Sequence, residues 1–213
     1  MKNILSHLQV FWLMRHPPAL FSRLFGLSWY RETFEQWIEP IQKTGSKILE
    51  VGCAGGDLSR LLAVRGMQVW AVDKSPVMLK EAQSATNAVH FKQADVSHLP
   101  FENQFFDSVL AASLLNVVNS PLEALTEMRR VCRPGGVISV LVPNQQFSDK
   151  DAMAYLEEKQ LIGFSRAAFL TWHRLAKKMD AETVQRYFQN CGMEKTTTRF
   201  LLGGMVVVVS AQL

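Results

Sequence analysis

Apolar and polar positions alternate along the middle of the chain with two different periods. Residues 47–52 are mostly apolar and run into three glycines within five residues, and residues 57–65 place three leucines at helical spacing before Gly66. An apolar run bounded by glycines is typical of a buried parallel strand, and the leucine spacing predicts a helix that ends at Gly66. The first unit is therefore a strand, a glycine turn and a helix.

The same alternation continues downstream. Four further short stretches are rich in β-branched or aromatic residues, and we predict strands there: 69–72, 89–92, 106–112 and 137–142. Ser75 and Ser120 are each followed by proline, the pattern of a helix N-cap and a first helical residue. Residues 133–136 are expected to end the second of these helices. Alternating strands and helices predict a parallel sheet covered by helices on both faces.

The C-terminal third does not continue this alternation of strands and helices. Residues 145–180 read as a helical, aromatic-bearing insertion after the fifth strand, followed by a last helix at 181–191. Two extended runs, 195–202 and 205–211, are separated by two glycines and are expected to form a closing hairpin. No linker divides the chain, so we predict one domain, 1–213, in four parts: an N-terminal helical cap (1–44), a core (45–144), the insertion or lid (145–180) and a closing helix and hairpin (181–213).

Composition limits the classes of function. The 213 residues are 48% hydrophobic and 20% charged, enough for one sizeable core. The net charge of +4 is scattered without a basic run, so no nucleic-acid-binding arm is indicated. Three widely spaced cysteines favour neither a disulfide framework nor a zinc site and fit a reducing cytoplasm. The N-terminus lacks the pattern of a signal peptide, and no apolar run is long enough for a membrane span.

The residues that suggest chemistry follow the predicted strands. The glycines after the first strand let the backbone approach a ligand, and Asp73 ends the second strand. Because open sheets of this kind bind ligands beyond the carboxyl ends of their strands, the pair predicts a nucleoside-bearing cofactor. The dinucleotide fingerprint Gly-x-Gly-x-x-Gly fails at Ala54 and Asp57, and no Gly-Lys-Ser/Thr follows as a Walker loop would require.

Taken in order, these residues resemble the class I S-adenosylmethionine-dependent methyltransferases that modify small molecules. The segment from Glu50 to Gly56 corresponds to that family's acid-x-Gly-x-Gly-x-Gly signature, with Ala54 in place of the middle glycine. The resemblance covers residues 45–143 well and implies an α/β, Rossmann-like three-layer sandwich. It further implies a seven-stranded, mostly parallel sheet with an antiparallel last strand, and S-adenosylmethionine as the cofactor.

The resemblance also implies roles for individual residues. Asp73 is expected to accept hydrogen bonds from both ribose hydroxyls, and Asp95 with Val96 to contact adenine. Ala54 should keep a negative φ, or Gly55 should take up the strain, because L-residues enter the left-handed region only at a cost. The expected cofactor-binding residues are Glu50, Gly52, Cys53, Ala54, Gly56, Asp73, Lys74, Met78, Asp95, Val96, Ala112 and Ser113.

Catalysis places few demands on the side chains. Methyl transfer is a direct displacement at a sulfonium carbon, so the protein needs chiefly to hold the reacting atoms in line and to exclude water. No dedicated catalytic residue is required, and if the acceptor is a hydroxyl the candidates are His173, His16 and Tyr30. Residues 112–116 lack the Asp/Asn-Pro-Pro-aromatic motif of DNA-modifying relatives and the acids of metal-dependent ones. We therefore expect neither a nucleic-acid substrate nor a metal site.

The methyl acceptor depends on the two segments outside the common core. Both are rich in aromatic residues and are expected to cover the cofactor edge as a lid over a small, apolar or aromatic molecule. Two alternatives remain open: an acceptor that is a membrane lipid or quinone, reached by peripheral contact of the N-terminal segment with a membrane, and a non-catalytic S-adenosylmethionine-binding sensor or partner protein. The pattern carries no prediction of the oligomeric state or of the atom methylated.

Overall fold

The structure is a computed structural model that describes residues 10–41 and 46–213. Its seven-stranded sheet has the order β3-β2-β1-β4-β5-β7-β6. The strands are β1 (Lys47–Val51), β2 (Gln68–Asp73), β3 (Val89–Gln93), β4 (Phe106–Ala112), β5 (Cys132–Pro143), β6 (Thr196–Leu201) and β7 (Val206–Gln212). Strand β7 pairs antiparallel with both β5 and β6, whereas β1 to β5 pair in parallel. The predicted α/β fold with an antiparallel last strand is confirmed.

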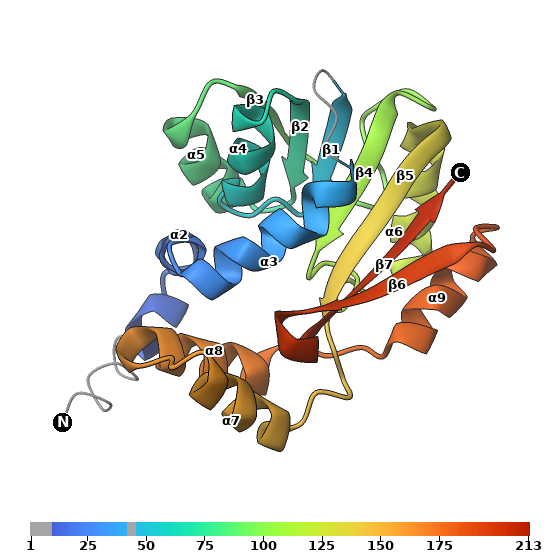
Figure 1. The fold of residues 1–213 in the computed structure, drawn as a ribbon. Coiled ribbons are helices and arrows are strands. Elements are labelled where there is room, and N and C mark those ends of the chain that lie inside the picture. Colours follow the sequence, from blue (N-terminus) through green and yellow to red (C-terminus); the bar gives the residue numbers. More distant parts are fainter. Residues whose placement is uncertain (1–9, 42–45) are drawn as a thin grey trace.

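Helices cover both faces of this sheet (Figure 1). One face carries α3 (Ser28–Ile38), α4 (Asp57–Val64) and α5 (Pro76–Ala85), and the other carries α6 (Pro121–Val131) and α9 (Ala181–Asn190). The central strands are buried, as the apolar run of β1 predicted: Ile48 and Leu49 are fully inaccessible to solvent. Ser75 and Ser120 cap α5 and α6 with their side chains, as their positions before proline indicated.

Strand β5 differs from its prediction. It begins at Cys132 rather than at residue 137, so the stretch expected to end α6 is already part of the sheet. The register against β4 shifts between Phe106 and Ser108, which accommodates the additional residues as an irregularity. A Cβ on Gly136 would lie 2.7 Å from the Asp107 carbonyl oxygen, so glycine is required by close packing at this point.

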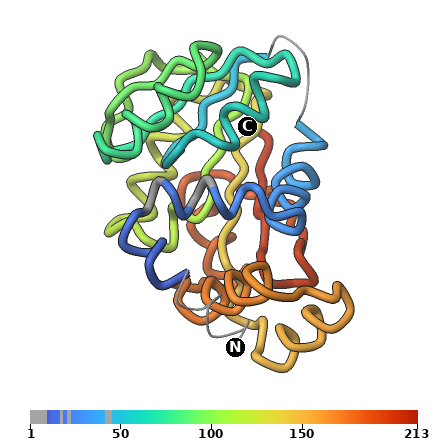
Figure 2. The backbone as a smooth tube through the Cα atoms, turned by 90° about the vertical axis from the view of Figure 1, so that its left-hand side faces the viewer, coloured from blue at the N-terminus to red at the C-terminus, as the bar shows by residue number. Residues whose placement is uncertain are grey.

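The remaining helices lie beyond the carboxyl ends of the parallel strands (Figures 1 and 2). They are α2 (Pro17–Phe25), the start of α3, α7 (Asp149–Glu158) and α8 (Gly163–Leu175); the short helices η1 (Glu39–Ile41) and η2 (Leu202–Gly204) follow α3 and β6. Residues 10–14 are also helical. Among the described residues, no helix has both the length and the apolar content that a bilayer-spanning segment needs.

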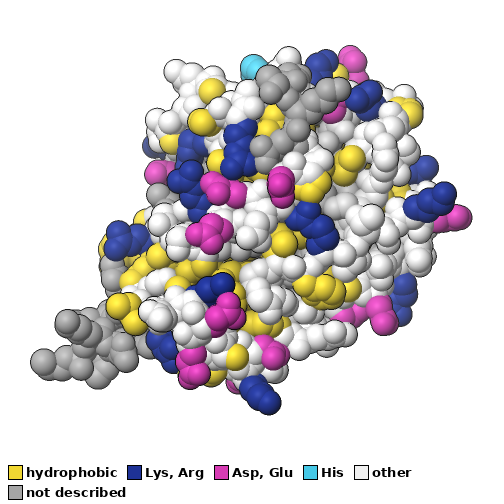
Figure 3. Space-filling view, viewed as in Figure 1, with side chains coloured by type: hydrophobic (Ala, Val, Ile, Leu, Met, Phe, Trp, Pro, Cys, Tyr) yellow, Lys and Arg dark blue, Asp and Glu magenta, His cyan; other side chains and the backbone are white. Residues whose placement is uncertain are grey.

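Aromatic side chains join α3 to α8. The ring of Trp29 lies 5.3 Å from that of Phe169 and 6.0 Å from that of Trp172, and its indole N–H donates to the Ser165 hydroxyl at 2.8 Å. Tyr30 meets the same Trp172 edge-on at 5.4 Å. Figure 3 shows hydrophobic side chains gathered between α3 and α8. Most of the aromatic pattern of both segments is therefore packing, and it brings two distant parts of the chain together over the sheet edge.

Candidate active site

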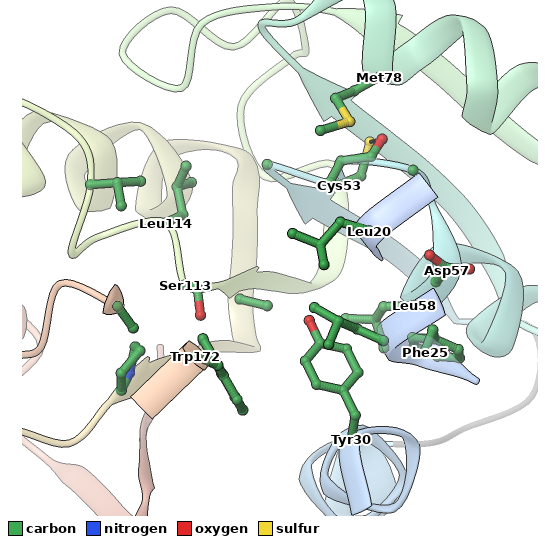
Figure 4. A pocket seen from close by; sticks show the side chains of 18 of the residues that line it. Leu20, Phe25, Tyr30, Cys53, Asp57, Leu58, Met78, Ser113, Leu114 and Trp172 are labelled. Atoms are coloured by element: carbon green, nitrogen blue, oxygen red, sulfur yellow. Dashed lines mark hydrogen bonds between the residues drawn. The ribbon is translucent and has the colours of Figure 1, made fainter. Parts of the chain in front are cut away.

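A cavity of about 610 Å³ opens at the carboxyl edge of β1, β2 and β4. The core contributes the loop after β1, the end of β2 and the residues that follow β4. The helices contribute Leu20 and Leu24 of α2, Tyr30 of α3 and Trp172 of α8. In Figure 4, Met78 lies at one end of this cavity and Tyr30 and Trp172 lie at the other. The cavity thus has one end built by the sheet and one built by the helices.

The glycine loop after β1 bends sharply beneath the cavity. The backbone N–H groups of Gly52 and Cys53 both donate to the Val72 carbonyl, at 2.8 and 3.0 Å, which ties the loop to β2. A Cβ on Gly52 would lie 2.9 Å from Leu114, whereas a Cβ on Gly55 would meet only Asp57, at 3.7 Å. Glycine at position 52 therefore serves close packing, and position 55 leaves open space for a ligand.

Ala54 corrects an expectation about this loop. Its φ is +46°, in the left-handed region, and Gly55 does not adopt a positive φ. The expected negative φ at Ala54 is therefore wrong, and so is the transfer of strain to Gly55. Ser113, which also lines the cavity, has a φ of +50°. Two non-glycine residues are thus held in a conformation that costs about 1 to 2 kcal/mol each, and such strain is typical of ligand-binding backbone.

Asp73 explains how Ala54 is held. Its Oδ2 accepts the Ala54 N–H and its Oδ1 accepts the Ser75 N–H, both at 2.8 Å. One carboxylate thereby fixes the glycine loop and the start of α5. Each carboxylate oxygen can accept a further hydrogen bond, so Asp73 retains acceptor capacity that two ribose hydroxyls could use.

Glu50 and Asp57 add two more carboxyl groups at the same end. Glu50 is 3% exposed and accepts a hydrogen bond from the Ser59 hydroxyl. Burial raises its pKa to about 8, against the lowering effect of that hydrogen bond. Burial also raises the pKa of Asp57, which pairs with Arg60. Sequence reasoning missed a role for Asp57, although an acid in the first turn of a helix after a glycine loop is a usable signal.

These groups fit S-adenosylmethionine. Three carboxyl groups at one end of a cavity suit a ligand with an ammonium and a sulfonium charge, and the open space at Gly55 admits its backbone contacts. Ser75 and Met78 line the adjoining wall, where Met78 offers an apolar surface to a nucleobase. Of the predicted cofactor residues, those that line the cavity are Glu50, Gly52, Cys53, Ala54, Asp73, Met78, Ala112 and Ser113.

Four predicted cofactor residues do not line the cavity. Gly56 faces away, because a Cβ there would lie 2.8 Å from the Phe91 ring. Lys74 is 81% exposed and pairs with Asp95 at 3.8 Å. The Asp95 carboxylate also accepts the Ser97 N–H and hydroxyl, and these bonds lower its pKa. Val96 follows Asp95 on this outer turn. The carboxylate expected at adenine is therefore engaged in a local turn.

Two of the three candidate catalytic residues lie away from the cavity. His173 is 2% exposed, with Nε2 2.9 Å from Asp149 Oδ1 and Nδ1 3.2 Å from Lys178 Nζ. His16 is exposed and bonds the Trp12 carbonyl. Neither lines the cavity. Sequence alone does not distinguish a histidine that packs from one that reacts, and the described contacts of both residues are local.

Tyr30 does line the cavity, and its hydroxyl points into it (Figure 4). Burial, with the nearby carboxyl groups of Asp57 and Glu50, raises the pKa of this phenol far above the neutral range. It therefore remains protonated at neutral pH and can donate a hydrogen bond. Tyr30 is therefore not a general base at neutral pH.

Asn116 is a lining residue that the sequence placed at this edge without a role. Its side-chain N–H donates to the Lys177 carbonyl at 3.0 Å and so joins the loop after β4 to the end of α8. Its Oδ1 is buried without a hydrogen-bond partner among the described residues. Within the same part of the chain, no group of three or more His, Cys, Asp or Glu side chains has the arrangement of a metal site.

Known proteins share this fold. Over 91% of this chain and 97% of the other, the structure superposes on an S-adenosylmethionine-dependent methyltransferase from Aquifex aeolicus, with a TM-score of 0.68 and 16% identity. The [4+2]-cyclase SpnF superposes with a TM-score of 0.64 and 16% identity, over 86% of this chain and 80% of that one. The fold therefore hosts more than one reaction.

Sequence comparisons relate the chain to methyltransferases. Residues 49–140 match the family model described as a methyltransferase domain. The malonyl-[acyl-carrier protein] O-methyltransferase of Enterobacter lignolyticus is 35% identical over 44% of this chain but only 38% of its own length. The phosphatidylethanolamine N-methyltransferase of Cereibacter sphaeroides is 34% identical over 62% of this chain and 66% of its own length.

A longer alignment extends beyond the core. The demethylmenaquinone methyltransferase of Staphylococcus haemolyticus is 30% identical over 185 residues, which are 78% of this chain and 76% of that enzyme. Its match includes far more than the glycine loop and the following strands. Together with the cavity geometry, this similarity shows that the chain belongs to the class I S-adenosylmethionine-dependent methyltransferases.

Proposed function

We propose that the chain transfers a methyl group from S-adenosylmethionine to a small apolar molecule. The observation that carries the proposal is the two-part lining of a single cavity. Carboxyl groups of Glu50 and Asp73 line the part built by the sheet, and the apolar side chains of Leu20, Phe25 and Trp172 line the part built by the helices. Because the two ends are continuous, a donor at the first can meet an acceptor at the second without crossing solvent.

The donor end acts by binding and orientation. S-adenosylmethionine supplies an electrophilic methyl group on a sulfonium sulfur. Asp73 is placed to accept hydrogen bonds from hydroxyls, Glu50 to balance positive charge, and Met78 to pack on a flat apolar ring. Helices α2 and α8 exclude water from the space in which an acceptor lies in line.

The acceptor end suits a molecule of the quinone or lipid class. Tyr30 and Trp172 offer aromatic faces to a planar ring, and the leucines of α2 offer an apolar wall to an alkyl chain. The protonated Tyr30 hydroxyl can donate a hydrogen bond to an acceptor oxygen. Relatives are named for demethylmenaquinone and for phosphatidylethanolamine, both of which are largely apolar. The three cysteines are free thiols, which fits a cytoplasmic enzyme.

A second function remains compatible with the same site. Neither candidate histidine lines the cavity, so a protein that binds S-adenosylmethionine as a sensor or assembly partner without methyl transfer has the same donor end. The two functions differ only in whether product forms.

Product formation therefore tests the proposal. The protein is incubated with S-adenosylmethionine and either a reduced polyprenyl naphthoquinone or phosphatidylethanolamine vesicles, and the extract is analysed by mass spectrometry. We expect one acceptor to become heavier by one CH₂, with Asp73→Ala as the blank. If S-adenosylhomocysteine raises the melting temperature while neither acceptor is methylated, the binding function replaces the proposal. Saturating ligand should add about 2.7 kcal/mol at a hundred times its dissociation constant.

A further inference from the structure

The opening of the cavity is surrounded by exposed apolar side chains. Met14, Val117 and Leu175 line the cavity and are nevertheless 39%, 54% and 63% exposed, so they lie where the cavity meets solvent. They come from three separate segments: the helix at residues 10–14, the loop after β4 and the last turn of α8. Phe11 and Trp12, beside Met14, are each 56% exposed. We call these five residues the rim.

Single exposed apolar residues are ordinary on a soluble protein, but three that line one opening, with two exposed aromatic residues on the same helix as one of them, form a cluster. Elsewhere on the described surface, Val64 is 86% exposed on α4 and Ile162 is 80% exposed before α8, and neither lines the cavity. The rim differs from these in being continuous with an apolar cavity. A tryptophan and a phenylalanine beside it are the residues that favour a membrane interface.

Basic side chains accompany the rim. The Arg15 guanidinium lies 4.7 Å above the Phe11 ring, Lys177 lines the cavity, and Arg174 is exposed in the last turn of α8. None of the three makes an ion pair with another described residue. Their positive charges are therefore available to an anionic surface.

The positive charge beside the rim favours an anionic bilayer over a second copy of the chain as the binding partner. In a symmetric dimer formed through the rim, the same basic residues of two copies would face each other, and like charges at an interface cost affinity. An anionic bilayer pairs with both parts of the surface, because its phosphates attract the cations and its acyl region accepts the apolar side chains.

We propose that the rim docks on an anionic bilayer, so that the cavity opens toward the membrane and its acceptor enters from the lipid. The proposal rests on the proposed function only for the identity of that acceptor. Docking itself requires no methyl transfer. It makes the enzyme a peripheral one that samples acceptors dissolved in the membrane rather than in water.

Flotation with vesicles tests this docking. The full chain is mixed with vesicles of phosphatidylcholine containing phosphatidylglycerol, or of phosphatidylcholine alone, and centrifuged through a sucrose gradient. The test variant is Phe11→Ser/Trp12→Ser, which leaves the cavity lining intact. The control is Val64→Ser/Ile162→Ser, which removes two apolar side chains that are more exposed than Phe11 and Trp12 and lie elsewhere on the surface. Arg15→Glu tests the charge separately.

We expect wild type and the control to float with anionic vesicles, less so at high salt and less with neutral vesicles. Phe11→Ser/Trp12→Ser should lower the partition coefficient about tenfold or more, because two exposed aromatic side chains that would enter the bilayer are lost. Arg15→Glu should reduce binding to anionic vesicles alone.

Three results would overturn the docking proposal. Wild type could remain at the bottom with both vesicle types, or the aromatic double variant could float as well as wild type. Light scattering without vesicles could instead show a dimer that the double variant dissociates, which would assign the rim to a second copy. Melting with S-adenosylhomocysteine is measured on the same samples. Loss of that shift would count against the proposed function, whereas absent flotation with the shift intact would count against docking alone.

Discussion

The two ends of the cavity are built in different ways. Most of the donor end comes from residues 50–78, a short stretch of chain, with Ala112 and Ser113 added from the end of β4. It consists of backbone and carboxyl groups held by hydrogen bonds such as that from the Ala54 N–H to Asp73. The acceptor end joins segments far apart in sequence: the Trp29 to Ser165 hydrogen bond spans 136 positions. Its groups are mostly apolar and are held by packing. One end is defined locally and the other only by the tertiary fold.

This difference indicates how such a protein can change its acceptor. A substitution on α2 or α8 alters the acceptor end without disturbing hydrogen bonds of the glycine loop, because the two ends share few side chains. Fixed donor geometry with a variable helical cover accounts for relatives that are named for such different acceptors.

The largest expected effect is on the donor end. Asp73→Ala removes the carboxylate that accepts the Ala54 and Ser75 N–H groups. Affinity for S-adenosylhomocysteine, measured by calorimetry, should fall by about 1.5 to 3 kcal/mol, the value of hydrogen bonds to a charged group. Asp95→Ala is the comparison, because that carboxylate is engaged by Ser97 on the outer turn. Equal losses in the two variants would mean that the donor site extends to Asp95.

Glu50 should make the donor end sensitive to pH. With a pKa of about 8 its carboxyl is protonated at neutral pH in the free protein, and a cationic ligand favours the ionised form. Affinity for S-adenosylhomocysteine, which carries the ammonium group, should therefore rise with pH up to about 8, by at most about tenfold per unit. Calorimetry in buffers of different ionisation enthalpy should detect proton release. Glu50→Gln should bind more weakly and without this pH dependence.

The free energy of unfolding of the ligand-free protein should fall as pH rises, whereas its affinity for S-adenosylhomocysteine should rise. A carboxyl whose pKa is raised from 4.5 to about 8 on folding keeps its proton while the unfolded chain loses it, so the free energy of unfolding falls across that interval as pH rises. Glu50→Gln should show a smaller fall in melting temperature over the same range. Parallel curves for the two proteins would contradict the raised pKa.

Two glycines with the same backbone conformation test how closely the chain packs around the donor end. Gly56→Ala places a Cβ 2.8 Å from the Phe91 ring and 3.0 Å from Ala82, whereas Gly135→Ala meets nothing within 4 Å. Both positions have a positive φ, of 74° and 76°, so both variants carry the same backbone strain. Gly56→Ala should be less stable than Gly135→Ala in urea unfolding by about 1 to 3 kcal/mol, the cost of overpacking. Equal stabilities would show that α5 and β3 shift at little energetic cost to accommodate the added Cβ.

The sequence predicted the donor end more fully than the acceptor end. Glycines after a strand and an acid at the end of the next are local signals, and most of the residues they marked line the cavity. The strands and their order along the chain were also predicted from local signals, and the main difference is the earlier start of β5. The packing of α3 against α8 depends on which aromatic side chains contact each other in the folded protein. The spacing of apolar residues within each helix does not predict these contacts.

The wrong φ at Ala54 and the position of His173 have specific physical causes. A negative φ at Ala54 follows from the general cost of left-handed backbone, but here a hydrogen bond to Asp73, 19 positions away, holds the residue in that region. His173 looked like a base because imidazole titrates near neutrality. It lies buried between Asp149 and Lys178, and neither contact is visible in the order of residues on α8.

The smallest expected effect concerns Ala54 itself. Ala54→Gly removes the Cβ that disfavours a φ of +46° and should stabilise the protein by up to about 1 kcal/mol. Ala154→Gly, at an exposed position inside α7, should instead destabilise it by about 1 kcal/mol. Thermal unfolding measures both. A loss of stability in both variants would mean that Ala54 is not strained.

The central claim is that one cavity joins a donor end to an apolar acceptor end. Its most direct test is the transfer of label from S-adenosyl-[methyl-³H]methionine into organic-extractable material by wild type, Asp73→Ala and Trp172→Ala. We expect label in the organic phase with wild type, loss of both binding and transfer in Asp73→Ala, and loss of transfer with unchanged S-adenosylhomocysteine affinity in Trp172→Ala. Full transfer by Trp172→Ala, or label confined to the aqueous phase with wild type, would contradict the claim.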